Sequence, residues 1–397
     1  MKKLLYLFSA GLLFSQLSLA QVHNLELSSY SNQLEIRATG SITLQPGFHL
    51  IPPAGQTVLI SVQRFPFVSG SPTTGQNYIL TRSFRSPVKA SQLSETRTID
   101  QENRTVQYFD GLGRSLQTVQ QQASPGFRDI VEHVEYDGFG RQTHQYLPYA
   151  DVGTSYGSYR STAKANQLAY YGSGSLDAHV KKTTAPYAVT VFENSPLNRV
   201  KEQGAPGVAW QPATTRGTSG RTVVSDYGTN VVSTTESVKL WQINTSKNGA
   251  TGTSNYVAGR LYKTVIKDEN WLSGKTGTVE EYKDFEDRVV LKRVWESEAK
   301  KLDTYYVYDD LGNLRYVVPP AYTSTSIAES ATGDFHELVY AYRYDGRQRL
   351  AEKKIPGKGW EWIVYNNNDQ PILTQDAVQR GKASKEWRYT KYDAFGR

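Results

Sequence analysis

The segment Tyr136-Asp137-Gly138-Phe139-Gly140-Arg141 is the most informative one in the chain, because versions of these six residues recur along it. Its fifth position holds Gly in the well-formed copies and Asp in the degenerate ones. Both residues enter the left-handed region at low cost, so this position is predicted to have φ > 0. The carboxylate at the second position can accept hydrogen bonds from the backbone N–H groups just ahead of it, closing an Asx-type turn. Each copy is therefore predicted to be the corner of a β-hairpin.

The other copies occupy residues 109–114, 308–313 and 392–397, with a looser copy at 344–349 and degenerate ones at 283–288 and 365–370. Their flanks are rich in β-forming residues, and several of the following strands end at a proline, which suits a strand end. The spacing predicts a repeat array with one hairpin per period. The structural residues of this turn motif are predicted to be Asp110, Gly113, Asp137, Gly140, Asp309, Gly312, Asp345, Asp393 and Gly396.

Composition favours an all-β protein. The 397 residues include 27 Tyr and 32 Gly but only one Met and no Cys. Aromatic residues and frequent turns are typical of β-sheets, and the absence of Cys excludes disulfides and thiolate sites. The formal net charge is +7, with basic residues scattered along the chain. Scattered charge indicates a solvated surface, so no nucleic-acid partner is expected.

Residues 1–20 have the pattern of a secretory signal peptide. Lys2-Lys3 precede an apolar stretch, and Ser18-Leu19-Ala20 form a small-x-small cleavage site. The apolar stretch is too short to span a bilayer comfortably, and no later stretch is long enough. The mature chain is expected to begin at Gln21, to lack a membrane span and to be secreted or displayed at the cell surface.

Three segments are expected after the signal peptide. Residues 21–70 alternate strand-like pieces with turns and predict a small β module, followed by a linker rich in Ser, Gly, Thr and Pro. Residues 79–235 begin with motif hairpins and then change character, which indicates a separate N-terminal domain. Residues 236–397 are predicted to form the main repeat array.

The aromatic-Asp-x-x-Gly-Arg repeats resemble those of the Rhs/YD-repeat family. The longer stretches 303–315 and 352–360 resemble its Bacteroidetes branch, in which a domain of unknown function precedes the repeats; parts of 79–235 resemble that domain. The resemblance implies hairpins wound into a large curved sheet or partial shell. In the family such a shell often encloses a C-terminal effector or toxin, a partner that this sequence does not contain.

Arg397 is the sixth residue of a well-formed motif, the point at which earlier copies begin a new strand. The chain is therefore expected to be the N-terminal part of a longer shell, truncated within its repeat array. The strand before this last corner would then have an unpaired edge, and such edges are prone to association or fraying. Faster hydrogen exchange is expected over residues 385–397 than around Asp309.

No catalytic, cofactor or metal site can be assembled from the sequence. His336-Glu337 begins like a zinc-protease motif but has no second His, and its context reads as a strand. Gly274-Lys275-Thr276 lacks the first Gly of a phosphate loop and reads as a hairpin turn. We therefore expect a non-enzymatic protein. A secreted glycosidase remains open, because paired carboxylates are close in space rather than in sequence.

Trp360-Glu361-Trp362 is the strongest candidate for ligand stacking. On a strand, Trp360 and Trp362 would point to one face and present a flat apolar platform. Sheet packing explains most aromatic residues here, since they alternate within strands. The alternative function is a cell-surface adhesin that binds carbohydrate or protein, with surface glycans as partners.

Overall fold

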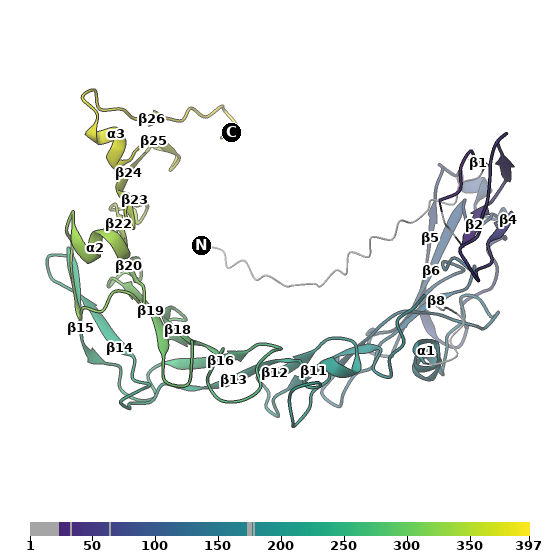
Figure 1. Ribbon diagram of the computed structural model, residues 1–397, viewed down its shortest axis with the longest axis horizontal. Coiled ribbons are helices and arrows are strands. Elements are labelled where there is room, and N and C mark those ends of the chain that lie inside the picture. Colours follow the sequence, from purple (N-terminus) through teal and green to yellow (C-terminus); the bar gives the residue numbers. More distant parts are fainter. Residues whose placement is uncertain (1–23, 32–33, 63–64, 173–176, 178) are drawn as a thin grey trace. The chain divides into compact units, whose positions relative to one another are not determined.

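The computed structural model describes residues 24–31, 34–62, 65–172, 177 and 179–397, and the predicted signal peptide lies outside them. The chain divides into two compact units (Figure 1). The first comprises Met1–Glu135 and Tyr146–Lys181, and the second comprises Tyr136–Gln145 and Lys182–Arg397. Each unit is nearly all β, which confirms the predicted fold class.

The first described strands form two short parallel pairs within the first unit. Strand β1 (Asn24–Leu27) pairs with β3 (Ser41–Leu44), and β2 (Glu35–Ala38) pairs with β4 (Leu59–Val62). Ile36 and Ala38 of β2 are buried.

A five-stranded antiparallel sheet forms the body of the first unit. Its order is β10-β8-β7-β6-β5, and helix α1 (Ala163–Tyr171) packs against it near β8 and β10. Buried Val106, Tyr108, Val119 and Val131 form its core with Tyr149 and Ala163. The strands and the short helix of this part are β5 (Asn77–Phe84), η1 (Ala90–Gln92), β6 (Glu102–Phe109), β7 (Ser115–Gln120), β8 (Ile130–His133) and β10 (Tyr149–Ala150).

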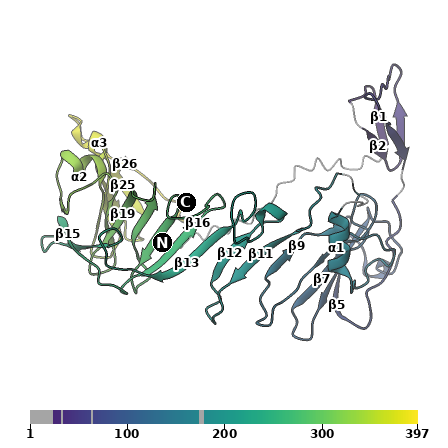
Figure 2. The ribbon, with the colours of Figure 1, turned by 60° about the horizontal axis from the view of Figure 1, so that its bottom comes forward.

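A 14-stranded sheet forms the body of the second unit, and from β11 to β26 every neighbouring pair is antiparallel. Figure 2 shows β11, β12, β13 and β16 side by side. The strands in chain order are β9 (His144–Tyr146), β11 (Tyr187–Phe192), β12 (Val200–Gly204), β13 (Val223–Thr229), β16 (Tyr262–Lys267), β17 (Val279–Lys283), β18 (Val289–Trp295), β19 (Lys301–Tyr308), β20 (Leu314–Val318), β22 (Tyr340–Tyr344), β23 (Leu350–Ile355), β24 (Gly359–Tyr365), β25 (Pro371–Gln375) and β26 (Arg388–Tyr389).

A three-stranded sheet packs on one face of the 14-stranded sheet. It consists of β14 (Lys239–Ile243), β15 (Gly249–Asn255) and β21 (Ser326–Ala328), and Figure 1 shows β14 and β15 on one side of β18 and β19. Burial alternates along β18 because the three-stranded sheet covers one face of the strand. Leu291 and Trp295 are buried, while Lys292 between them is exposed. The shared core includes Trp241, Leu291, Tyr305 and Tyr316.

The two compact units divide the chain at residues 135/136, 145/146 and 181/182. β13 and β16 lie on either side of residue 235 and pair through six residues of register. The structure differs from the sequence analysis at one motif. His336-Glu337 lies in helix α2 (Gly333–Leu338), so the expected strand context was wrong. The helix is explained by its buried anchor Phe335. Two further short elements are η2 (Val208–Trp210) and α3 (Ala377–Gly381).

Candidate functional site

The repeated corner is built around one carboxylate. In the copy at 136–141, Asp137 Oδ1 accepts hydrogen bonds from the backbone N–H groups of Phe139 and Arg141, both at 2.9 Å. The Arg141 side chain donates from Nε to Asp137 Oδ2 at 2.8 Å. Gly140 has φ of 77° and donates its N–H to the Asp137 carbonyl at 2.9 Å. The corner therefore satisfies the backbone groups that a tight turn exposes.

The other copies have the same geometry. Their first acceptors are Asp110, Asp284, Asp309, Asp345, Asn366 and Asp393, each of which accepts from the backbone N–H groups two and four residues ahead. The fifth motif position has a positive φ in every copy: Gly113, Asp287, Gly312, Gln348, Asp369 and Gly396. The degenerate copies are thus complete corners.

The structure also contains corners that the sequence analysis missed. Ser124 accepts from the Arg128 backbone N–H through Oγ at 2.9 Å, and Phe127 has φ of 56°. Asn244 accepts from the Asn248 N–H at 3.1 Å, and Lys247 has φ of 56°. The available signal was a Ser or Asn four residues before an Arg or Asn, which is weaker than the aromatic-Asp-Gly pattern.

A β-bulge follows many of these corners. Tyr308 pairs with Leu314 while Val307 pairs with Tyr316, which leaves one extra residue in the second strand. The same shift occurs after the corners at Asp110, Asp284, Asp345 and Asn366. A bulge bends its strand and increases the local right-handed twist. Repetition of the bulge explains why the 14-stranded sheet bends along its length in Figure 1.

Motif tyrosines connect four corners, those at Asp309, Asp345, Asn366 and Asp393, each to the corner before it. The Tyr308 hydroxyl donates to the carbonyl of Val289, the residue directly after the corner Asp284–Arg288, at 3.0 Å. The equivalent bonds run from Tyr344 to Leu314, from Tyr365 to Leu350 and from Tyr392 to Pro371, at 2.9–3.1 Å. We call this series of hydroxyl–carbonyl bonds the tyrosine ladder. It gives the first motif position a role beyond β propensity.

Motif arginines reinforce the tyrosine ladder. The Arg288 guanidinium lies 5.3 Å from the ring centre of Tyr308, and that of Arg349 lies 4.6 Å from Tyr365. In each case the arginine is bound to the Asp of its own corner and stacks on the tyrosine of the next corner. Such contacts contribute roughly 0.5–1 kcal/mol at exposed sites. Aromatic ring, carboxylate and guanidinium thus act as one unit between neighbouring hairpins.

Four corner carboxylates, those of Asp110, Asp137, Asp345 and Asp393, have lowered pKa values that favour their charged form. The backbone N–H of Arg141 is the largest influence that lowers the pKa of Asp137, burial acts in the opposite direction, and the Arg141 side chain adds to the lowering. For Asp345 the guanidinium of Arg349 is the largest cause of a lowered pKa. These groups are acceptors with their oxygens occupied, unlike a general acid, whose pKa is raised toward the working pH.

Trp360 and Trp362, the two tryptophans proposed for ligand stacking, have different surroundings in the structure. Trp360 packs against the core of the second unit, and the Arg343 guanidinium lies 4.3 Å from its ring. Trp362 is 39 % exposed, lies 6.3 Å from Trp387 between ring centres and has Arg380 4.2 Å from its ring. The exposed aromatic pair is therefore Trp362 with Trp387, which is itself 41 % exposed.

Within the described residues, no three His, Cys, Asp or Glu side chains are grouped so as to hold a metal ion. Over the same part of the chain, no helix is both long and apolar enough to cross a membrane.

The chain is a β-hairpin repeat protein. The same hydrogen-bonded corner recurs at the turns of its antiparallel sheet, and tyrosine hydroxyls join one corner to the next. Residues 80–223 match the domain family of unknown function DUF6443. No curated protein matches the chain in sequence.

Several solved structures of Tc toxin components resemble the chain. The crystal structure of TcdB2-TccC3-TEV gives a TM-score of 0.44 and 14% identity over 74% of this chain, and that of TcdB2-TccC3-Cdc42 gives 0.42 and 14% over 76%. A Photorhabdus luminescens Tc holotoxin pore gives 0.41 and 14% over 74%. The matched region spans 12% of each of those chains.

Proposed function

We propose that this chain is a secreted structural protein of the Rhs/YD-repeat type and forms part of the wall of a β-shell. The observation that carries the proposal is the continuous antiparallel sheet from β11 to β26, in which the tyrosine ladder joins the successive corners from Asp284 to Asp393. Neighbour-to-neighbour coupling of this kind suits an extended wall, because each hairpin is held by the next.

The wall would serve to enclose or carry an effector domain encoded after residue 397 in the same gene. The resemblance of the repeats to Rhs proteins supports this role. The test is limited proteolysis of the full-length gene product. We expect the effector segment to resist protease until denaturant opens the sheet. Digestion of that segment at the rate of the isolated effector, with the sheet still intact, would refute enclosure.

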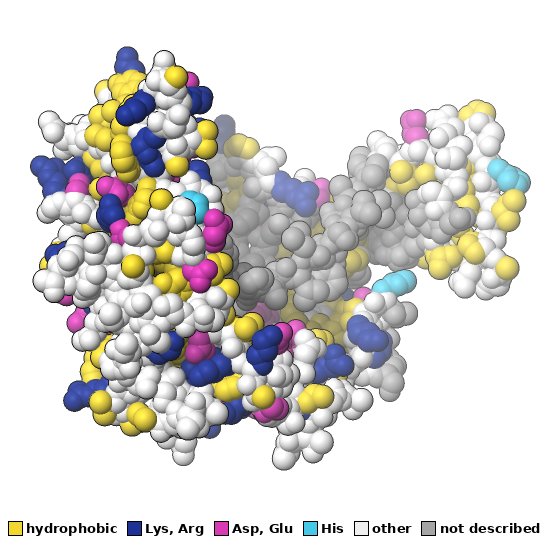
Figure 3. Space-filling view, turned by 60° about the vertical axis from the view of Figure 1, so that its left-hand side comes forward, with side chains coloured by type: hydrophobic (Ala, Val, Ile, Leu, Met, Phe, Trp, Pro, Cys, Tyr) yellow, Lys and Arg dark blue, Asp and Glu magenta, His cyan; other side chains and the backbone are white. Residues whose placement is uncertain are grey.

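The proposed role is non-enzymatic and extracellular. The regular carboxylates support the first part, since Asp137, Asp284 and Asp345 are each engaged by an arginine and by backbone N–H groups. The basic and acidic side chains that Figure 3 shows interspersed on one face support a solvated surface without a nucleic-acid partner. Hydrolysis of any polysaccharide in a substrate panel would overturn the non-enzymatic role. Retention of Met1 in cytoplasmic protein, rather than a secreted chain starting at Gln21, would overturn the extracellular role.

A second candidate function is a glycan- or protein-binding adhesin, favoured by the exposed Trp362–Trp387 pair. Aromatic side chains of this kind are enriched at binding surfaces. A glycan array on the purified chain would test the carbohydrate form of this role. Signals lost in Trp362→Ala but kept in Trp271→Ala would support it, and an array without signals would reject it.

A further inference from the structure

Strand β5 is an edge of the five-stranded sheet in the first unit. It has eight residues and, among the described residues, pairs with β6 alone. The other edge strands of the two large sheets are much shorter, since β10 and β26 have two residues each and β9 has three. Natural proteins protect sheet edges with short strands, proline, lysine or bulges. Residues 77–81 of β5 include no proline and no charge and pair with β6 without a register shift, so this edge has none of these protections.

The pairing of β6 shows which backbone groups of β5 face outward. A backbone N–H just past the end of β7 donates to the Arg104 carbonyl at 2.9 Å, so Arg104 faces β7. Backbone groups alternate between the two sides of a strand, so Thr105 faces β5, where it lies opposite Thr81. The same alternation directs the N–H and C=O groups of Tyr78 and Leu80 away from β6. No described residue is hydrogen-bonded to these outward groups.

The side chains at this edge are apolar on both faces of the sheet. Ile79 is 56 % exposed, and Tyr78 and Leu80 are also exposed. Tyr78 and Leu80 lie opposite Tyr108 and Val106 of β6, which are buried in the core of the sheet, and directly opposite residues share a face. A further strand beside β5 would therefore continue the core on one face and cover Ile79 on the other.

The sequence of β5 is self-complementary about Ile79. When two β5 strands run antiparallel about a twofold axis at Ile79, Tyr78 of each copy lies opposite Leu80 of the other. The outward N–H and C=O groups of these two residues are the ones that such a pair joins by hydrogen bonds. Their side chains form an aromatic–aliphatic pair on the core face, and Ile79 meets its own copy on the other face. A second β5 thus satisfies both the backbone and the side chains of this edge.

The charge of β5 also favours this antiparallel arrangement. Arg82 is the only charged residue of the strand, and it donates to the buried carboxylate of Glu102, which also accepts from Arg104. This cluster keeps a net positive charge, so two β5 strands aligned in the same direction and register would repel each other. In the antiparallel pair centred on Ile79, the two Arg82 residues are about 20 Å apart along the strands, where salt screens their repulsion.

We propose that β5 pairs with β5 of a second copy of this chain, antiparallel and centred on Ile79, and so joins two chains into a twofold dimer through their first units. Twofold dimers are the commonest assemblies of soluble proteins, and their interfaces are self-complementary in this way. The pairing merges two five-stranded sheets into one continuous sheet. The dimer is independent of whether the second unit encloses an effector, and it uses no residue of the tyrosine ladder.

Sedimentation equilibrium of the purified chain over a series of concentrations tests the dimer. We expect the average mass to rise with concentration from that of one chain toward that of two. Ile79→Lys should raise the dissociation constant at least about tenfold, because each dimer loses two buried isoleucines and gains a like-charge pair. Ile266 is the matched control, since it is also exposed but lies on β16, which is paired on both sides, and Ile266→Lys should associate like the wild type. A wild-type chain that stays monomeric, or a folded Ile79→Lys chain that dimerises equally well, would overturn the proposal.

A mixture of two variants tests the position of the twofold axis. Ile79→Glu should also be monomeric on its own, and an equimolar mixture with Ile79→Lys should restore the dimer, because residue 79 then faces the opposite charge. Hydrogen exchange gives a second readout. The amides of Tyr78 and Leu80 should exchange more slowly as the wild-type concentration rises, whereas that of Thr81, which faces β6, should be protected at every concentration. A mixture that stays monomeric, or unchanged exchange at Tyr78 and Leu80, would contradict pairing about Ile79.

Discussion

The left-handed position of the corner accepts residues as different as Gly140, Phe127 and Gln348, whose φ values are 77°, 56° and 61°. A non-glycine residue in this region is strained by its Cβ. The strain is tolerated where the hydrogen bonds of the corner determine the backbone, so the side-chain acceptor at the start of the corner, rather than the glycine, defines the motif. Two substitutions at the 136–141 corner separate these contributions.

The first prediction concerns backbone conformation. Gly140→Ala should destabilise the second unit by about 1 kcal/mol, because alanine is unfavourable at positive φ. Gly138 lies in the same turn without a positive φ, and a Cβ added there would meet no atom within 4 Å. Gly138→Ala should therefore be neutral or slightly stabilising in urea denaturation. Equal losses for the two variants would show that φ at residue 140 is not the cause.

The second prediction concerns the carboxylate. Asp137→Ala should cost at least about 1 kcal/mol, because the N–H groups of Phe139 and Arg141 lose their acceptor. Asp137→Asn should cost less, since Asn366 caps its own corner through Oδ1 with bonds of 2.9 and 3.0 Å. Urea denaturation of both variants measures the difference. If Asp137→Asn lowered the free energy of unfolding as much as Asp137→Ala, the ion pair with Arg141 would be the dominant contribution of this carboxylate to stability.

A third prediction at the residue scale concerns pH. His133 is buried against Tyr146, and neither ring nitrogen has a partner among the described residues. Burial is the largest influence and lowers the pKa of His133 from 6.5 to about 4, with Lys164 acting in the same direction and Glu135 against it. The unfolded chain therefore takes up this proton first as the pH falls. Stability from the neutral His133 is complete above pH 6.5 and is lost between pH 6.5 and 4, by up to about 3 kcal/mol.

Thermal unfolding of the wild type and of His133→Phe across this pH range tests the assignment. The variant should lose much of the decline in stability between pH 6.5 and 4. His179, which is exposed, serves as the matched control, and His179→Gln should keep the full decline. A decline of the same size in all three proteins would assign it to other groups.

At the scale of the element, each hairpin is locally encoded but is held by its neighbour. The turn at Asp137 could be predicted because all of its hydrogen bonds join residues within the corner. The bond from the Tyr308 hydroxyl to the Val289 carbonyl could not, since it joins two hairpins and depends on their register. Helix α2 was missed for a similar reason. Its Phe335 is fixed by tertiary packing against the core, which a strand-like sequence pattern does not reveal.

The tyrosine ladder gives a prediction at this scale. Tyr308→Phe removes the hydroxyl but keeps the ring under Arg288, so it should cost about 1 kcal/mol. Tyr306 is two residues earlier on the same strand and donates no hydrogen bond within the described structure, which makes Tyr306→Phe the matched control. Chemical denaturation of the two variants gives the comparison. Equal stability of the two variants would show that the Tyr308 hydroxyl does not stabilise the sheet.

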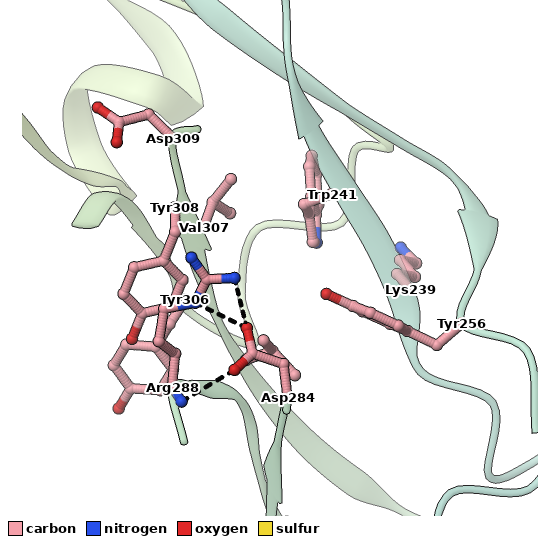
Figure 4. A pocket seen from close by; sticks show the side chains of 10 residues that line it. Lys239, Trp241, Tyr256, Asp284, Arg288, Tyr306, Val307, Tyr308 and Asp309 are labelled. Atoms are coloured by element: carbon pink, nitrogen blue, oxygen red, sulfur yellow. Dashed lines mark hydrogen bonds and ion pairs between the residues drawn. The ribbon is translucent and has the colours of Figure 1, made fainter. Parts of the chain in front are cut away.

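At the scale of the whole molecule, the sequence predicted the class of fold but not its assembly. The repeats indicated one hairpin per period, and the sheet from β11 to β26, which is antiparallel throughout, has that arrangement. The cover of β14, β15 and β21 was not predicted, because β21 joins the other two from more than seventy residues away. A cavity of about 150 Å³ lined by Trp241, Tyr256 and Arg288 (Figure 4) was not predicted for the same reason, since its walls come from separate hairpins that meet only in the folded protein.

We expect the sheet from β11 to β26 to behave as one coupled wall rather than as a row of independent hairpins. Native-state hydrogen exchange in increasing denaturant distinguishes the two, because amides that open together share one free energy of opening. We predict that ladder amides of β18, β19, β20 and β22 share one such value and that Tyr308→Phe lowers it for all four strands. Separate values for each hairpin, with the effect of Tyr308→Phe confined to β19 and β20, would contradict the account.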